Sequence, residues 1–222
     1  MRVGVAGTRW LVALGCCVAL ATARAAESDP LAPLHIDTPR LTAEARDTRD
    51  WALGAGDHGN LPFAIVDKKN ARLFVFHGDG RLAGDSAALL GLAPGDHAVP
   101  GAGQRVANLL PSERTTPAGR FLSEPGHNLN GEAIVWVDYD AAIAIHRVRP
   151  GPAREQREQR LASASADDNR VSLGCVVVPV AFYEQVVSPV LGRSRGVVYV
   201  LPESQPAMAM LNAYQAGALT SR

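Results

Sequence analysis

Residues 133–148 (AIVWVDYDAAIAIHRV) carry the strongest strand signal in this chain. Runs rich in apolar, mostly β-branched and aromatic residues occupy 133–139 and 142–148, and the pair Asp140-Ala141 separates them. Such runs favour β-strands, and a short break with a polar residue is typical of a turn. The stretch therefore predicts two neighbouring strands joined by a tight turn.

Further strand signals lie on both sides of this pair. Phe63–Asp67 and Arg72–Phe76 flank the polar turn 68–71, which predicts a hairpin. The remaining strand-like runs are 81–90, 171–178 and 196–201. A helix is expected to begin at Pro179, with apolar residues at helical spacing behind it, and to be limited by Pro189. The sequence thus predicts a mostly β domain with one or two short helices.

The composition is that of a globular protein. Of the 222 residues, 47% are hydrophobic and 20% are charged, which excludes disorder throughout the chain. The formal net charge is +0, so the sequence gives no sign of a basic surface, and no nucleic-acid partner is expected. With 21 glycines, 15 prolines and 5% aromatic residues, the chain favours a β-rich domain with many turns over a helical bundle.

The N-terminal segment 1–25 predicts a secretory signal peptide. Arg2 and Arg9 accompany the apolar run Trp10–Ala21, and residues 23–25 place alanines at both cleavage-site positions. An uncleaved membrane anchor is the alternative, but a helix needs about 20 apolar residues to span a bilayer. The expectation is an exported, periplasmic protein that meets the membrane only through this transient segment.

The rest of the chain divides into three parts by its composition. Residues 26–56 form an N-terminal segment, 57–203 a catalytic-domain candidate, and 204–222 a C-terminal tail. Within the domain, 150–169 is polar and breaks the strand pattern. It predicts either a solvated short helix in a long loop or a lid beside an active site, since loops of this length are often functional.

The number and position of the cysteines limit the kinds of site that the chain can form. Cys16 and Cys17 leave with the signal peptide, unless Gly15-Cys16 is a lipoprotein site, and Cys175 is the one cysteine of the mature domain. A single cysteine excludes a disulfide framework and a zinc site built from paired cysteines. The six histidines never occur in an i, i+4 pair, so neither a metal nor a cofactor is expected. Cys175 is then either an inert buried residue or a nucleophile.

His146 is the candidate base for Cys175. A cysteine nucleophile needs a base or cation nearby, and His146 ends the strand-like run AIAIH. Gly174 allows a close backbone approach beside Cys175, and consecutive backbone N–H groups there can form an oxyanion hole. The alternative is a satisfied core or edge histidine, and the spacing alone leaves both possibilities open.

From about Leu61 to Glu203, the chain resembles the L,D-transpeptidase catalytic domain, the YkuD-like fold. The segments that carry the resemblance occur in the family's order, and they are PFAIVDKKNARLFVF, ERTTPAGRF, AIHRV, VSLGCVVVP, AFYEQVVSPVL and GVVYVLPE. The fold that this resemblance implies is a β-sandwich with one or two short helices packed against it.

The resemblance also implies acyl transfer on peptidoglycan stem peptides. Cys175 would attack the L,D peptide bond before a terminal D-alanine with His146 as base, and an amine of a second stem peptide would resolve the thioester into a 3→3 cross-link. The other residues implied are Ser172 and Gly174 for the loop and the oxyanion, and Thr116, Pro117, Gly119 and Arg147 for the substrate cleft. Neither ATP nor a metal is implied, and a monomer is expected.

Three features depart from the family pattern. Leu173 replaces the second histidine of the common S-H-G-C motif, Val177 stands where Asn or Arg is usual, and the gap from His146 to Ser172 is long. Because two polar groups are lost, a weakened peptidoglycan-binding module remains an alternative. The resemblance also leaves an L,D-carboxypeptidase or other hydrolase open, because some family members hydrolyse the same peptides. The intact Cys175 favours an enzyme. A drier pocket beside Leu173 predicts a raised thiol pKa and a slow enzyme.

Overall fold

The computed structural model describes residues 41–217, together with Met1 and Gly4. The predicted signal peptide at 1–25 and its cleavage site lie outside the residues that can be described. No helix among the described residues is both long and apolar enough to cross a membrane. Residues 41–217 fall within one compact unit.

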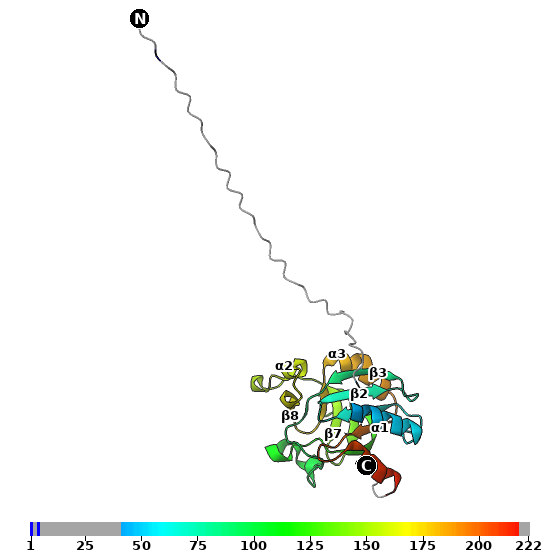
Figure 1. The fold of residues 1–222 in the computed structure, drawn as a ribbon. Coiled ribbons are helices and arrows are strands. Elements are labelled where there is room, and N and C mark those ends of the chain that lie inside the picture. The colour runs from blue at the N-terminus through cyan, green and yellow to red at the C-terminus, as the bar shows by residue number, and fades with distance from the viewer. Residues whose placement is uncertain (2–3, 5–40, 218–222) are drawn as a thin grey trace. The chain divides into compact units, whose positions relative to one another are not determined.

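Most of the described strands belong to one large sheet. Eight strands pair in the order β3-β2-β1-β10-β5-β6-β7-β9, and β4 pairs with β8 in a second, small sheet (Figure 1). Neighbours are antiparallel except β1–β10, β7–β9 and β4–β8, which are parallel. The strands are β1 Phe63–Asp67, β2 Arg72–Phe76, β3 Leu82–Ala87, β4 Leu90–Gly91, β5 Gly119–His127, β6 Ala133–Asp138, β7 Ile143–Arg147, β8 Arg170–Ser172, β9 Val176–Val178 and β10 Gly196–Val200.

Short helices complete the described part of the chain. The α-helices are α1 Ala43–Gly54, α2 Arg157–Ala162, α3 Val180–Phe182, α4 Ser188–Leu191 and α5 Ala207–Gln215. A π-helix, η5 Tyr183–Val187, joins α3 to α4. The short 3-10 helices are η1 Ala102–Asn108, η2 Pro111–Glu113, η3 Ala153–Glu155 and η4 Asp167–Asn169.

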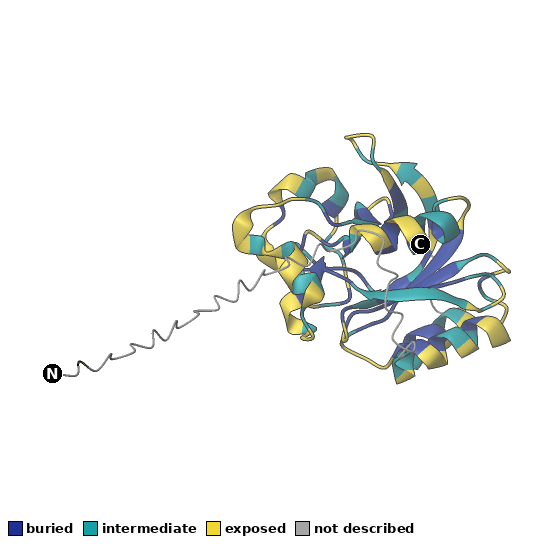
Figure 2. Ribbon diagram, turned by 90° about the horizontal axis from the view of Figure 1, so that it is seen from above, coloured by how far each residue is buried: buried dark blue, intermediate teal, exposed yellow. Residues whose placement is uncertain are grey.

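Strand β5 folds the large sheet over on itself. Its first half, Gly119–Ser123, pairs with β10, and its second half, Glu124–His127, pairs with β6. The main hydrophobic core takes alternate residues of β1, β2 and β10 from one half of the sheet, and of β6, β7 and β9 from the other. Successive side chains of a strand point to opposite faces, so both halves turn one face to this core. The predicted mostly β, sandwich-like fold is confirmed, and Figure 2 shows the buried residues concentrated in the strands.

Helices α1 and α5 cover the other face of β1, β2 and β10. Ala52 of α1 and Leu211 of α5 are fully buried there, in a second core with the alternate set of strand residues. Composition alone placed these helices in a separate segment (26–56) and a tail (204–222). The structure joins both to the 57–203 domain, because each helix buries its apolar face on the sheet.

The predicted hairpins are present, and one helix prediction needs correction. The hairpin β1–β2 has the predicted bounds, and the pair at 133–148 forms β6 and β7. The helix after Pro179 does not stop at Pro189 but continues to Leu191. Pro189 lies directly after the π-helix in a helical run without interruption, and the change of hydrogen-bond pattern at η5 accommodates the proline there.

Candidate active site

Parallel pairing of β7 and β9 brings His146 close to Cys175. His146 on β7 is paired in register with Val177 of β9, and Cys175 lies just before that strand. Val177 is also bonded on its other side to Leu89, with N–O distances of 2.7 Å and 2.9 Å between the two residues. The strand that follows the cysteine is therefore held from both sides.

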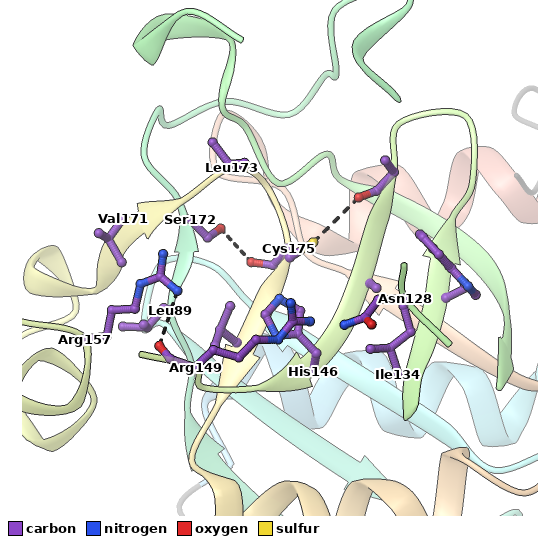
Figure 3. A pocket seen from close by; sticks show the side chains of 14 residues that line it. Leu89, Asn128, Ile134, His146, Arg149, Arg157, Val171, Ser172, Leu173 and Cys175 are labelled. Atoms are coloured by element: carbon purple, nitrogen blue, oxygen red, sulfur yellow. Dashed lines mark hydrogen bonds between the residues drawn. The ribbon is translucent and has the colours of Figure 1, made fainter. Parts of the chain in front are cut away.

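Cys175 and His146 line one cavity of about 290 Å³. Most of its wall is apolar, and the side chains of Asn128, Arg149, Arg157 and Ser172 add polar groups to those of the two candidate residues (Figure 3). The residues that line it are Leu89, Asn128, Ile134, Trp136, Ala142, Ala144, His146, Arg149, Arg157, Val171, Ser172, Leu173, Cys175 and Val177. A concave, largely apolar site with a few converging polar groups has the character of a small-ligand or active site.

The His146 ring is held in one orientation. Its Nδ1 lies 2.8 Å from the backbone oxygen of Arg147. A carbonyl oxygen can only accept, so Nδ1 carries the proton and Nε2 keeps its lone pair. Burial lowers the pKa of His146 to about 4, and the positive charges of Arg149 and Arg157 act in the same direction, against the bond to Arg147 and the charge of Glu132. At neutral pH the imidazole is therefore an uncharged base.

The Cys175 thiol is also uncharged at rest. Burial raises its pKa, and the nearby backbone N–H of Ala144 and the charge of Arg149 only partly oppose that effect. The Sγ atom donates a long hydrogen bond of 3.6 Å to the backbone oxygen of Ala142. Ala142 has a φ of 55°, a left-handed conformation that is uncommon for alanine and often occurs at functional sites. The site thus holds a neutral thiol and a neutral imidazole rather than an ion pair.

The turn 172–175 is fixed by side-chain and backbone hydrogen bonds. Ser172 Oγ donates to the backbone oxygen of Cys175 (2.7 Å) and accepts from the N–H of Gly174 (3.0 Å). Thr116 Oγ1 donates to the oxygen of Gly174 (2.8 Å) and accepts from the N–H of Gly91 (2.9 Å). Two hydroxyl groups therefore hold the turn 172–175. That of Ser172 belongs to the turn itself, and that of Thr116 comes from a distant part of the chain.

Gly174 cannot be replaced by a residue with a side chain without disturbing this turn. Its φ is +133°, and a Cβ atom there would lie 2.6 Å from Ile143 Cδ1 and 2.8 Å from the oxygen of Thr115. Its N–H already donates to Ser172 Oγ. The oxyanion role expected for Gly174 would require that bond to open, and it stays a prediction.

The four residues expected in the substrate cleft do not line this cavity. Thr116, Pro117 and Gly119 are buried outside the cavity lining, and Thr116 supports the turn 172–175. Arg147 points away from the cavity, over the ring of Tyr183 and 3.3 Å from Glu184. His146 and Arg147 are consecutive in a strand, so one side chain in the cavity places the other on the opposite face.

Two arginines that no sequence motif singled out line the cavity instead. Arg149 follows β7, and Arg157 is the first residue of α2, within the polar segment 150–169. The segment 150–169 contains the expected short helix, α2, and this helix brings the side chain of Arg157 to the cavity. Charge alone could not have identified Arg157, because several arginines alternate with glutamates in this segment and its loop conformation decides which one turns inward.

Leu173 and Val177 both line the cavity, so the two departures from the family motif lie at the site. Leu173 is 40% exposed and forms part of the rim, whereas Val177 is buried. Replacement of Leu173 by histidine adds a polar group next to the thiol and lets water closer, which favours the thiolate. We expect Leu173→His to react faster with iodoacetamide near neutral pH than the native protein, whose reaction rate rises only at alkaline pH.

Leu122 provides a matched control for this substitution. It is 47% exposed, lies on β5, and does not line the cavity. Leu122→His should leave the pH profile of alkylation unchanged. A native thiol that already titrates below pH 7 would show that Leu173 does not hold back its ionisation.

Metal ligation has no candidate within the described part of the chain. No group of three or more His, Cys, Asp or Glu side chains there could hold a metal ion. The ring of another buried histidine, His58, lies 3.1 Å from the backbone oxygen of Ala52 and 3.0 Å from that of Gly78. It is a satisfied structural residue.

Comparison with known proteins gives distant structural similarities. No family model and no curated protein matches the chain. The helical cell shape determining protein Pgp2 from Campylobacter jejuni is similar over 71% of this chain and 56% of its own, with 16% identity and a TM-score of 0.43. The chain thus spans little more than half the length of that protein.

Two further solved structures are similar to the chain. The Ldtfm–avibactam carbamoyl enzyme has 18% identity and a TM-score of 0.38, over 64% of this chain and 49% of that one. The catalytic domain of an E. faecium L,D-transpeptidase has 18% identity and a TM-score of 0.35, over 63% of this chain and 95% of that one. An activity does not carry over at this similarity, so the function is argued from the site itself.

Proposed function

We propose that this protein is a cysteine acyltransferase of the L,D-transpeptidase type that acts on peptidoglycan stem peptides in the periplasm. The observation that carries the proposal is the shared cavity of Cys175 and His146, with the imidazole oriented so that Nε2 is free to accept a proton. These two residues are far apart in the sequence, and the fold brings them to one apolar cavity. The ordered sequence resemblance supplies the substrate class.

The neutral resting pair fits a general-base mechanism. As Cys175 Sγ attacks the carbonyl carbon of the L,D bond, His146 Nε2 takes the thiol proton. The C–N bond then breaks, and the proton passes from His146 to the nitrogen of the departing D-alanine. An amine of a second stem peptide attacks the thioester carbon and gives a proton to His146, which passes that proton to the departing Sγ. The C–S bond breaks, the thiol is restored, and the new C–N bond is the cross-link. Water in place of that amine gives hydrolysis.

A binding module with weakened chemistry is the second candidate. The raised pKa of Cys175, the lowered pKa of His146 and the apolar side chains of Leu173 and Val177 favour it, because each disfavours a reactive thiolate. Such a module would bind stem peptides without releasing D-alanine.

Release of D-alanine from a purified stem tetrapeptide tests the proposal. We expect the protein to release D-alanine and to form a thioester that can be detected by intact mass on Cys175. An added acceptor stem peptide should turn the acyl-enzyme into a cross-linked dimer, and without acceptor the tripeptide should accumulate. Binding of the tetrapeptide with no release, at any pH up to the alkaline range, would support the binding module instead.

A further inference from the structure

Two arginines stand in the wall of the Cys175 cavity. Arg149 and Arg157 line it together with Cys175 and His146 (Figure 3), whereas no aspartate or glutamate is found among the described residues of this wall. Apolar walls lower the local dielectric and strengthen the field of such charges. The cavity is therefore suited to a ligand with an anionic group.

Both guanidinium groups keep donors that no protein group uses among the described hydrogen bonds. Arg157 Nε donates to Glu155 Oε2 (2.6 Å), and its Nη1 donates a long bond of 3.5 Å to the oxygen of Arg149. Arg149 Nε lies 2.8 Å from Glu132 Oε2, yet this buried atom makes no hydrogen bond of acceptable geometry. Since a guanidinium has five N–H donors in a planar fork, most donors of both residues are available to a carboxylate.

The same two arginines also line a second hollow. It has a volume of about 250 Å³ and lies along the segment 149–159. Glu158 lines this second hollow, so its charge disfavours an anion there, while the Cys175 side holds no such charge among its described lining residues. An anion bound to the guanidinium forks is therefore favoured on the side of the nucleophile.

We propose that Arg149 and Arg157 hold the free C-terminal carboxylate of the donor peptide and so restrict the reaction to its last residue. This inference rests on the proposed function, because it takes a peptide carbonyl carbon at Cys175 as the reacting atom. In a C-terminal residue, the carboxylate is joined through one carbon to the scissile nitrogen, so its site must lie close to the nucleophile. An interior residue offers a neutral amide at that place, which accepts only weaker hydrogen bonds from the unused guanidinium donors.

Binding of a carboxylate would also change the pKa of His146, the proposed base. Burial is the main cause of the low pKa of His146, and the positive charges of Arg149 and Arg157 lower it further, whereas Glu132 raises it. A bound carboxylate offsets the two positive charges, so the pKa of His146 should rise when the ligand binds. The imidazole would then become a stronger base only once the peptide that needs it is in place.

A binding experiment tests the carboxylate site without turnover. N-acetyl-D-alanine and N-acetyl-D-alanine amide are titrated into Cys175→Ala protein with ¹⁵N-labelled histidine. We expect the acid to bind about 10- to 100-fold more tightly than the amide, since hydrogen bonds to charged groups are the strong ones. The acid should also raise the pKa of His146, whereas the amide should not.

Substitutions assign that preference to the two arginines. Arg149→Gln and Arg157→Gln should each lose most of the preference for the acid, and Arg157→Lys should retain part of it because the charge remains. Arg154→Gln is the matched control, since Arg154 is exposed, lies in the same segment and does not line the cavity. Equal binding of acid and amide by the Cys175→Ala protein with both arginines intact would overturn the proposal. A preference for the acid that survives loss of both arginines would overturn it as well.

Turnover separates this inference from the proposed function. The stem tetrapeptide and its C-terminal carboxamide are compared by kcat/KM, and the native protein should prefer the free acid by a similar factor. A protein that releases nothing from either peptide but binds N-acetyl-D-alanine through both arginines would contradict the acyltransferase and support the carboxylate site. Release at equal rates from both peptides would support the acyltransferase and contradict the carboxylate site.

Discussion

Cys175→Ala is expected to abolish the release of D-alanine from a stem tetrapeptide, with a loss of at least about 10⁴-fold, because it removes the covalent route altogether. The acyl-enzyme mass should disappear at the same time. Cys175 makes one long hydrogen bond through its sulfur, so the free energy of unfolding should change by only about 1 kcal/mol. Release of D-alanine is measured by a coupled assay, and stability by urea unfolding.

Cys175→Ser is the companion variant. Serine keeps a hydroxyl that can donate to the oxygen of Ala142. With a pKa near 4, His146 is too weak a base to make that hydroxyl as good a nucleophile as the thiol. We expect it to bind the tetrapeptide as the native protein does and to release almost no D-alanine. Substantial release by Cys175→Ala would place the nucleophile elsewhere and end the cysteine mechanism.

His146→Gln is expected to lower kcat/KM by about 10² to 10⁴, the usual contribution of a general base. Glutamine can still donate a hydrogen bond to the oxygen of Arg147, but it has no basic nitrogen to take the thiol proton. The reaction of Cys175 with iodoacetamide should slow as well. His127→Gln is the matched control, because His127 is exposed at the end of β5 and does not line the cavity.

The pH dependence of stability shows whether His146 is buried as an uncharged group. Its folded pKa is about 4, below the usual 6.5, so the unfolded chain binds the proton first as the pH falls. Stability should therefore be complete above pH 7 and should decline between pH 7 and pH 4, by up to about 3 kcal/mol at this site. His146→Gln should lack that part of the decline. The same decline in both proteins would mean that His146 titrates normally.

Local patterns were enough to predict most of the strands and to single out Cys175 and His146 as a candidate pair. The runs at 63–76 and 133–148 alternate or cluster apolar residues strongly enough to define their hairpins. Cys175 and His146 stood out because Cys175 is the one cysteine outside the predicted signal peptide and His146 follows the strong apolar run AIAI. Gly174 was expected to allow a close backbone approach, and the structure shows a φ of +133° there and no room for a Cβ atom beside Ile143 and Thr115.

The strand order and the cavity wall depend on long-range contacts that the sequence does not display. No local pattern shows that β10 lies between β1 and β5, or that α1 and α5 share the face behind them. Arg147 was assigned to the cleft although strand alternation, once His146 is placed inside, turns it outward. Arg157 begins α2, and the irregular chain before this helix places it at the cavity, which composition cannot predict.

The position of β10 has a consequence for how the chain folds. The last strand in sequence, Gly196–Val200, fills the middle of the sheet and bonds to β1 on one side and β5 on the other. Until it arrives, β1 and β5 present open edges with unpaired backbone groups, which are prone to pair with other chains. Contacts between such distant segments make folding slow, since a long loop must close before they form. A growing polypeptide of this sequence therefore cannot complete its large sheet before residues 196–200 have been synthesised.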